Sequence, residues 1–186
     1  PALVTELARR QVVTSARVTS VNDGADWIWD MVDRLLPAHR VEVLDWPHAV
    51  QNLSKAGEAA WGEGKAKTYA WLAEREKELW DGRVLDVRIA LEQLPERRRA
   101  RGKAIRQVRE YFAQHEVRLD YRRFRDEGRP IGSGTVESAA KNVVGWRMKR
   151  GGQNWSRPGA TRMLAVLGEL HSGRWHEAWQ RLAKAA

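Results

Sequence analysis

The 186-residue chain contains no cysteine and no apolar run long enough to cross a lipid bilayer. The absence of cysteine excludes a disulfide-stabilised scaffold and a zinc site built from thiolates. A membrane span needs about 20 consecutive apolar residues, and no signal-peptide core opens the chain, so we expect a soluble, cytoplasmic protein. A Gly-x-x-x-x-Gly-Lys-Ser/Thr phosphate loop and a Gly-x-Ser-x-Gly nucleophile elbow are also missing, which excludes the enzymes that depend on them.

Positive charge is what the chain has in excess. It carries 33 Lys and Arg against 24 Asp and Glu, a net charge of +9. Residues 1–50 carry −2, residues 51–94 carry −1 and residues 95–186 carry +12, so the excess lies entirely in the second half. A polyanionic partner, most simply nucleic acid, is therefore indicated. The 42% apolar fraction and ten tryptophans exclude a disordered chain, and the length favours one domain over 1–186.

The basic residues of the second half form three clusters. The first lies in 97–109 and surrounds several sides of a predicted helix, so a solvated surface explains it best. The second comprises Arg122, Arg123, Arg125 and Arg129. The third has glycines and tryptophans between its charges, which suits close approach by a nucleic-acid backbone, and it comprises Arg147, Lys149, Arg150 and Arg157.

The first 49 residues predict a strand–helix–strand unit. Ala2 to Gln11 has the pattern of the middle of a helix, and no Met precedes it, so we expect a piece of a longer protein. A β-branched run in 16–21 predicts a strand that ends at Asn22-Asp23-Gly24. Apolar residues from Trp27 to Leu36 follow the period of an amphipathic helix that Pro37 ends. Residues 41–44 predict a second strand, and this order is typical of parallel pairing.

The remainder of the chain is predicted to be mainly helical. Residues 49–115 are rich in Ala, Glu, Lys and Leu, and glycines 57, 62, 64 and 82 are the expected breaks. Residues 121–134 are predicted to be irregular. Thr135 is the expected N-cap of a helix to about residue 150, Ser156 and Pro158 begin another helix, and a last one follows Gly173. We assign the tryptophans other than Trp155 to the core.

Three carboxylates occupy special positions. Asp23 and Asp45 each follow a predicted strand, and parallel neighbouring strands bring both to one edge of the sheet. Glu137 follows the glycine-rich run 128–134, in the first turn of a helix. Acids brought together are costly unless a cation neutralises them, and Mg²⁺ prefers such oxygen ligands. Alternatives to a shared metal site stay open for each residue. Asp-Gly after a strand is a common turn, and an acid in the first turn of a helix complements the helix dipole. His48 can be a structural histidine whose hydrogen bonds are satisfied inside the protein.

Four segments, in order, resemble the bacterial insertion-sequence DDE transposases of the ISKra-type group and their Mutator-like relatives. Residues 22–29 (NDGADWIW) resemble the segment of the second catalytic aspartate, and residues 44–49 (LDWPHA) resemble the Cys/Asp-x-x-His motif. Residues 130–139 (PIGSGTVESA) resemble the segment of the final glutamate, and residues 147–156 (RMKRGGQNWS) the basic tail. The sequence separation of 114 between Asp23 and Glu137 leaves room for the helical insertion of that family.

The resemblance implies the C-terminal portion of a ribonuclease-H-like catalytic core that cuts and joins DNA ends with two divalent metals, Mg²⁺ or Mn²⁺. The fold class is α/β, predominantly helical: an incomplete strand–helix–strand core (1–49), a helical insertion (50–120), and a part with the glutamate helix and basic helical tail (121–186). By position, Asp23 and Glu137 are catalytic metal ligands, whereas Asp45 and His48 belong to the accessory motif. No Asp precedes Asp23, so we expect the first aspartate upstream or lost in a decayed copy, and no strand transfer by this polypeptide alone.

The resemblance also implies partners: insertion-sequence ends, target DNA and further copies of the transposase, in the bacterial cytoplasm and associated with the nucleoid, with no membrane. Lys141 lies one helical turn beyond Glu137 and is expected to hold a phosphate. The third basic cluster would bind further phosphates of the same DNA. Trp155 has two possible roles: it stacks on an unpaired base of the DNA end, or it packs inside the protein. Two other functions stay open: a non-catalytic DNA-binding helical module, and a truncated regulator that joins the assembly of intact transposase.

Overall fold

The computed structural model describes residues 2–95, 99–149 and 151–185. Those residues form a predominantly helical α/β chain with one two-stranded parallel sheet, which confirms the predicted fold class at this level. Internal contacts divide the chain into two compact units, Pro1–Ser133 and Gly134–Ala186. Whether they act together as the single catalytic domain expected from the sequence stays a prediction. Within the described ranges, no helix combines the length and apolar composition that crossing a membrane requires.

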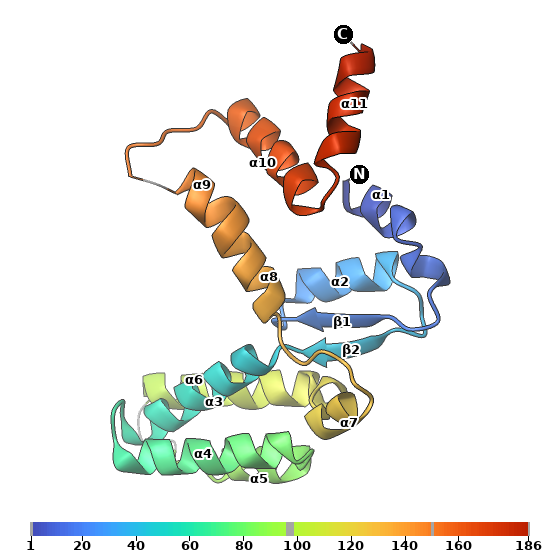
Figure 1. The fold of residues 1–186 in the computed structure, drawn as a ribbon. Helices are drawn as coiled ribbons and strands as arrows, with labels where there is room; N and C mark the ends of the chain where they lie inside the picture. Colours follow the sequence, from blue (N-terminus) through green and yellow to red (C-terminus); the bar gives the residue numbers. More distant parts are fainter. Residues whose placement is uncertain (1, 96–98, 150, 186) are drawn as a thin grey trace. The chain divides into compact units, whose positions relative to one another are not determined.

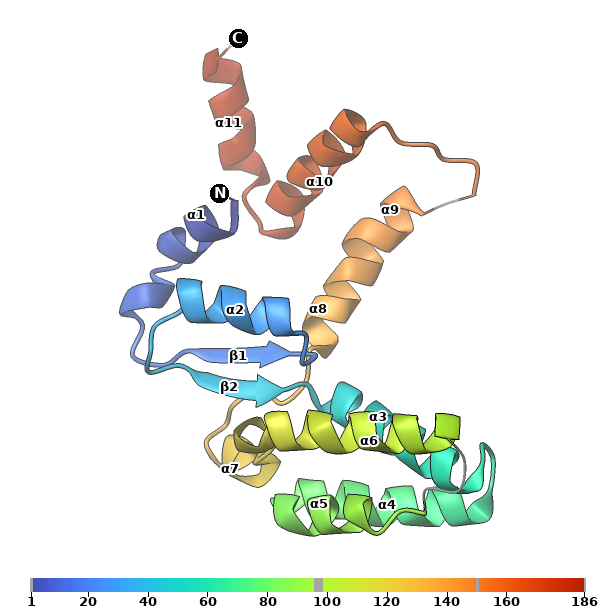
Figure 2. The same cartoon turned by 180° about the vertical axis from the view of Figure 1, so that it is seen from behind.

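The first unit opens with the predicted strand–helix–strand arrangement (Figures 1 and 2). After α1 (Ala2–Arg9) and the short η1 (Val12–Thr14) come β1 (Thr19–Asn22), α2 (Asp26–Leu35) and β2 (Val41–Leu44). The strands pair in parallel, with Asn22 opposite Leu44. The helix α2 lies along β1 and buries Trp29 and Val32. The parallel pairing predicted from the sequence is confirmed, and its register brings the residues after both strands to one edge.

Four helices form the layer below the sheet in Figure 1: α3 (Trp46–Trp61), α4 (Ala66–Trp80), α5 (Val84–Glu92) and α6 (Arg99–Gln114). The helix α3 packs on both α4 and α6. The predicted break at Gly57 is wrong, because this glycine is buried inside α3. A Cβ there would lie 3.2 Å from Thr68 Cγ2 and 3.3 Å from the Trp71 ring of α4, so the glycine permits close helix packing.

A short helix, α7 (Tyr121–Asp126), follows η2 (Glu116–Arg118) in the segment predicted to be irregular. Asp120 caps it by accepting a hydrogen bond from the Arg123 N–H at 3.2 Å. The helix buries Tyr121 and Phe124, and the Tyr121 hydroxyl donates to the Leu44 carbonyl at 3.0 Å. Burial of these aromatics against β2 stabilises a helix too short to form alone.

The described residues of the second unit form three helical stretches. The first runs through α8 (Gly134–Ala139), the π-helical η3 (Ala140–Gly145) and α9 (Trp146–Met148), and α10 (Arg157–His171) and α11 (Trp175–Ala185) follow. The first stretch begins at Gly134, so the expected N-cap at Thr135 is wrong by two positions. Ser156 is confirmed as the cap of α10, since its hydroxyl accepts from the Gly159 N–H at 3.2 Å.

The tryptophans are not all in the core. Trp29 is 6% exposed, and Trp46, Trp61 and Trp71 pack against the core of the first unit. The core assignment is wrong for five others, which are 41–66% exposed: Trp27, Trp80, Trp146, Trp175 and Trp179. The helical period shows that apolar residues share one face of a helix, but it does not show whether another element packs against that face. In the second unit, no residue whose burial is described is buried, although α10 and α11 carry apolar faces.

Candidate metal and nucleic-acid site

Asp23 occupies the exposed turn between β1 and α2. Its Oδ1 atom accepts a hydrogen bond from the Ala25 N–H at 3.0 Å, which closes the turn. Its Oδ2 atom has no hydrogen-bond or ion-pair partner in the described part of the chain. Divalent cations such as Mg²⁺ prefer carboxylate oxygens of this kind, so Asp23 fits a metal ligand.

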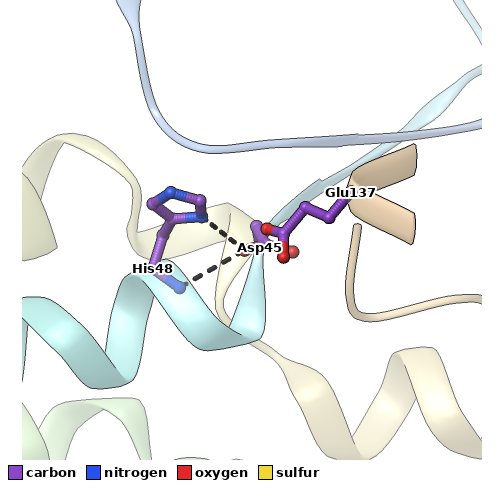
Figure 3. A group of neighbouring side chains, drawn as sticks. All are labelled: Asp45, His48 and Glu137. Atoms are coloured by element: carbon purple, nitrogen blue, oxygen red, sulfur yellow. Dashed lines mark hydrogen bonds and ion pairs between the residues drawn. The ribbon is translucent and has the colours of Figure 1, made fainter. Parts of the chain in front are cut away.

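Asp45 follows β2 at the same edge of the sheet, but its carboxylate is already engaged. The side chain is fully buried, and its Oδ2 atom accepts from the His48 backbone N–H at 3.3 Å and from His48 Nδ1 at 2.5 Å (Figure 3). Burial alone would raise the pKa of Asp45, but the hydrogen bonds from His48 and Ser133 outweigh it and lower the pKa. Asp45 is therefore an ionised N-cap of α3, held inside the protein.

The other oxygen of Asp45 anchors the glycine-rich run. The Oδ1 atom accepts from the Ser133 N–H at 2.5 Å, and the Trp46 N–H donates to the Ile131 carbonyl at 2.9 Å. These two bonds fix residues 131–133 beside the end of β2. The Asp45–His48 pair thus acts as a latch between the sheet edge and this run, and the accessory role of the two residues stays a prediction.

Glu137, also drawn in Figure 3, belongs to the second unit. It lies exposed in the first turn of α8, where a carboxylate complements the helix dipole. Its predicted position just inside a helix is correct. Its role as a metal ligand stays a prediction.

The helix α6 holds the turn that contains Asp23, which the sequence did not reveal. The Tyr111 hydroxyl donates to the Asp23 carbonyl at 2.9 Å, and Gln114 Nε2 donates to Asp26 Oδ1 at 3.0 Å. Both partners lie 88 residues earlier in the chain. The spacing from Tyr111 to Gln114 puts both on one helix face, but no sequence pattern says which distant turn that face meets.

Arginines of the first unit are mostly engaged within it. Arg109 donates from Nε to the Leu91 carbonyl at 2.9 Å and so caps the end of α5. In the second basic cluster, Arg125 donates to the Trp80 carbonyl at 2.7 Å, and its guanidinium lies over the Trp80 ring. Arg129 of the same cluster donates to Thr19 Oγ1 at 2.9 Å. These residues hold loops and helix ends together.

The predicted DNA-binding cations of the second unit differ from those arginines. They are exposed, and their side chains have no ion-pair or hydrogen-bond partner among the residues described: Lys141, Arg147, Lys149 and Arg157. Arg150 lies outside the described residues. Trp155 is half-buried against the start of α10, and its indole Nε1 is buried with no partner in the described ranges, which favours the packing reading.

A scan against protein-family models and searches of curated proteins and solved structures find no match to the chain. The functional assignment therefore depends on the sequence motifs and on the geometry of the individual residues. That geometry offers one exposed carboxylate at a parallel sheet edge and one engaged carboxylate beside it. It also offers a separate set of cations whose side chains have no partner among the described residues.

Proposed function

We propose that the chain is the C-terminal part of the catalytic domain of a DDE transposase, and that it acts on insertion-sequence DNA. Asp23 and Glu137 would hold divalent metal ions for DNA cleavage and strand transfer. The observation that carries the proposal is the Asp23 side chain. It is exposed after a parallel strand, and its Oδ2 atom has no hydrogen-bond or ion-pair partner among the described residues. Ligands bind at the carboxyl ends of strands in open α/β sheets, which favours a site there.

The position of Glu137 along the chain supports a shared site. Ser133 is bonded to Asp45 at the edge that also carries Asp23. Glu137 follows Ser133 by four residues, and at 3.8 Å per residue its Cα can lie no more than about 15 Å from that of Ser133. The latch therefore limits how far the glutamate can move from the sheet edge.

The remaining elements take the roles that the resemblance implies. The β1–α2–β2 unit would be part of a ribonuclease-H-like core, and α3–α6 would be its helical insertion. A third carboxylate, from an upstream strand, would complete the metal site, and metals held in this way activate a water or a 3′-hydroxyl and stabilise the leaving oxygen. The cations of the second unit would hold DNA phosphates, and Lys141 would be the one nearest Glu137 in sequence.

The test of Asp23 as a ligand is Fe²⁺-directed cleavage of the purified chain. Iron that replaces Mg²⁺ generates radicals which cut the backbone next to the bound ion, so a weak site is still located. We expect cleavage near residues 22–24, suppressed by excess Mg²⁺ and lost in Asp23→Asn. The matched control is Asp26→Asn, another exposed carboxylate three residues away, which should cleave like the parent. Equal cleavage in the parent and Asp23→Asn would refute the proposed metal role.

A DNA-binding helical module without catalysis is the second candidate. It is favoured by the predicted DNA-binding cations of the second unit, whose side chains have no partner among the described residues. It requires DNA binding but no metal at Asp23. Cleavage unaffected by Asp23→Asn, together with DNA binding that depends on those cations, would select it.

A further inference from the structure

We infer that Tyr111 is a positioning residue for the Asp23 carboxylate, and that α6 sets the geometry of this turn across 88 residues of sequence. The inference depends on the proposed function, in which Asp23 binds a metal ion. Tyr111 does not contact that ion in the proposal. It acts by fixing the backbone from which the carboxylate projects.

Three residues, two on α6 and one just beyond its end, face the turn. Tyr111 donates to the Asp23 carbonyl at 2.9 Å and Gln114 to Asp26 Oδ1 at 3.0 Å. His115 is buried, and its Nε2 atom would lie 3.1 Å from a Cβ at Gly24. Residues i and i+3 share one face of a helix, so one face of α6 holds the turn at both of its ends, Asp23 and Asp26.

Gly24 is shaped to this surface. Its φ of +95° lies in the left-handed region, which disfavours any residue with a Cβ. A Cβ at this position would lie 2.7 Å from Tyr111 Cε2 and 2.9 Å from its hydroxyl oxygen. The Tyr111 ring therefore occupies the space that a side chain at residue 24 would need. Glycine at this position lets the turn and the Tyr111 ring pack closely together.

The Tyr111 hydroxyl remains a hydrogen-bond donor at any physiological pH. Burial raises the pKa of Tyr111 above its usual range, and the negative charges of Asp23 and Asp45 raise it further, although a hydrogen bond from Asn52 opposes the shift. A protonated phenol next to two carboxylates can bond the Asp23 carbonyl without competing for the metal-binding oxygen.

A second layer stiffens this contact. Arg118 donates from Nη1 to His115 Nδ1 at 3.0 Å and from Nε to Glu42 Oε2 at 2.7 Å, and its guanidinium lies 4.1 Å from the Trp29 ring centroid. His115 is thus held from the side opposite Gly24. Supporting groups of this kind keep a ligand within the narrow range of geometry that a metal site requires.

The experiment is Fe²⁺-directed cleavage at residues 22–24 as a function of Fe²⁺ concentration, in Tyr111→Phe. This substitution keeps the ring and removes only the hydroxyl, and we expect the apparent Fe²⁺ affinity at Asp23 to fall about fivefold. The matched control is Tyr121→Phe, because that hydroxyl also donates to a backbone carbonyl in the same unit, Leu44 at 3.0 Å. A similar loss of thermal stability is expected in both variants, with a loss of metal affinity only in Tyr111→Phe.

The possible outcomes separate the two proposals. If Fe²⁺ cleaves the Asp23→Asn variant near residues 22–24 as it cleaves the parent, the proposed function is overturned. The positioning role of Tyr111 alone is overturned by a different pair of results. These are a loss of cleavage in Asp23→Asn together with equal Fe²⁺ affinities in Tyr111→Phe and Tyr121→Phe. If circular dichroism shows that Tyr111→Phe does not fold, Gly24→Ala displaces the same contact from the other side. A folded Gly24→Ala variant with parental Fe²⁺ affinity also overturns the positioning role.

Discussion

The two units differ in what their basic residues contact. The first unit holds 24 Lys and Arg against 21 Asp and Glu, and most of its described arginines contact carboxylates, carbonyls or aromatic rings. The second holds nine Lys and Arg against three Asp and Glu. Six of its described cations, the four predicted DNA contacts together with Arg162 and Lys184, have no side-chain partner among the described residues. A count of charges along the sequence treats the two sets alike, but only an unpaired cation can gain a phosphate without losing a bond.

The difference extends to the interior. The first unit has a core of fully buried residues such as Leu53, Phe112 and Tyr121, and its buried arginine contacts contribute to the same packing. The second unit buries none of the residues whose burial is described. Substitution of a cation should therefore reduce stability in the first unit and nucleic-acid affinity in the second.

The largest effect is expected for Arg118→Ala. Arg118 is 20% exposed and bonds Glu42 at 2.7 Å, so its loss leaves a mostly buried carboxylate with one partner fewer. We expect a loss of about 3 kcal/mol in the free energy of unfolding, measured by urea denaturation. Arg34→Ala, which removes an exposed arginine bonded only to the Asp30 carbonyl, should change stability by less than about 0.5 kcal/mol. Equal losses in the two variants would contradict the distinction.

The second prediction removes the four described cations that the sequence predicted to bind DNA, as Lys141→Ala, Arg147→Ala, Lys149→Ala and Arg157→Ala; none of the four has a side-chain partner among the described residues. Each phosphate contact that is lost should make the salt dependence of DNA affinity shallower by about 0.9 in log–log slope. We therefore expect at least a tenfold loss of affinity at low salt, measured by fluorescence anisotropy with a duplex of mixed sequence. The free energy of unfolding should stay near that of the parent.

The matched control removes four exposed arginines of the first unit, each of which has an acidic partner: Arg83, Arg88, Arg122 and Arg123. Both variants lose four positive charges, so a general effect of net charge would reduce their DNA affinities equally. If the salt slope changes only in the variant of the second unit, the unpaired cations are the DNA contacts. An equal change in the two variants would contradict the comparison between the units.

The smallest effect concerns the pH dependence of the paired network. Burial alone would raise the pKa of Glu42, but hydrogen bonds from Arg118 and Arg40 outweigh it and lower the pKa from 4.5. Because the unfolded chain binds this proton more tightly, Glu42 stabilises the fold above pH 4.5, and the contribution is lost as the pH falls below that value. Unfolding of Glu42→Gln should therefore depend less on pH over this acidic range than unfolding of the parent. Glu110→Gln, at an exposed carboxylate with no partner in the described ranges, should match the parent.

Much of the local structure follows from the sequence. The strand at 41–44, the helix that ends before Pro37 and the cap at Ser156 were predicted because short-range rules decide them: β-branched runs, helical period and capping hydroxyls. The parallel strand pair was also predicted, since a helix between two short strands leaves little choice. The helix α7 and the interior position of Gly57 were not, because burial against distant elements overrides local preference at both places.

For the candidate site, the sequence determined which groups are available: the carboxylates Asp23, Asp45 and Glu137, and a basic second half. The tertiary structure decided which groups are already engaged. It buried the Asp45 carboxylate, which bonds His48 and Ser133, left the Asp23 side chain exposed, and brought Tyr111 to the Asp23 turn. The physical reason is that hydrogen bonds between residues 88 apart depend on how helices pack, and a one-dimensional pattern does not contain that information.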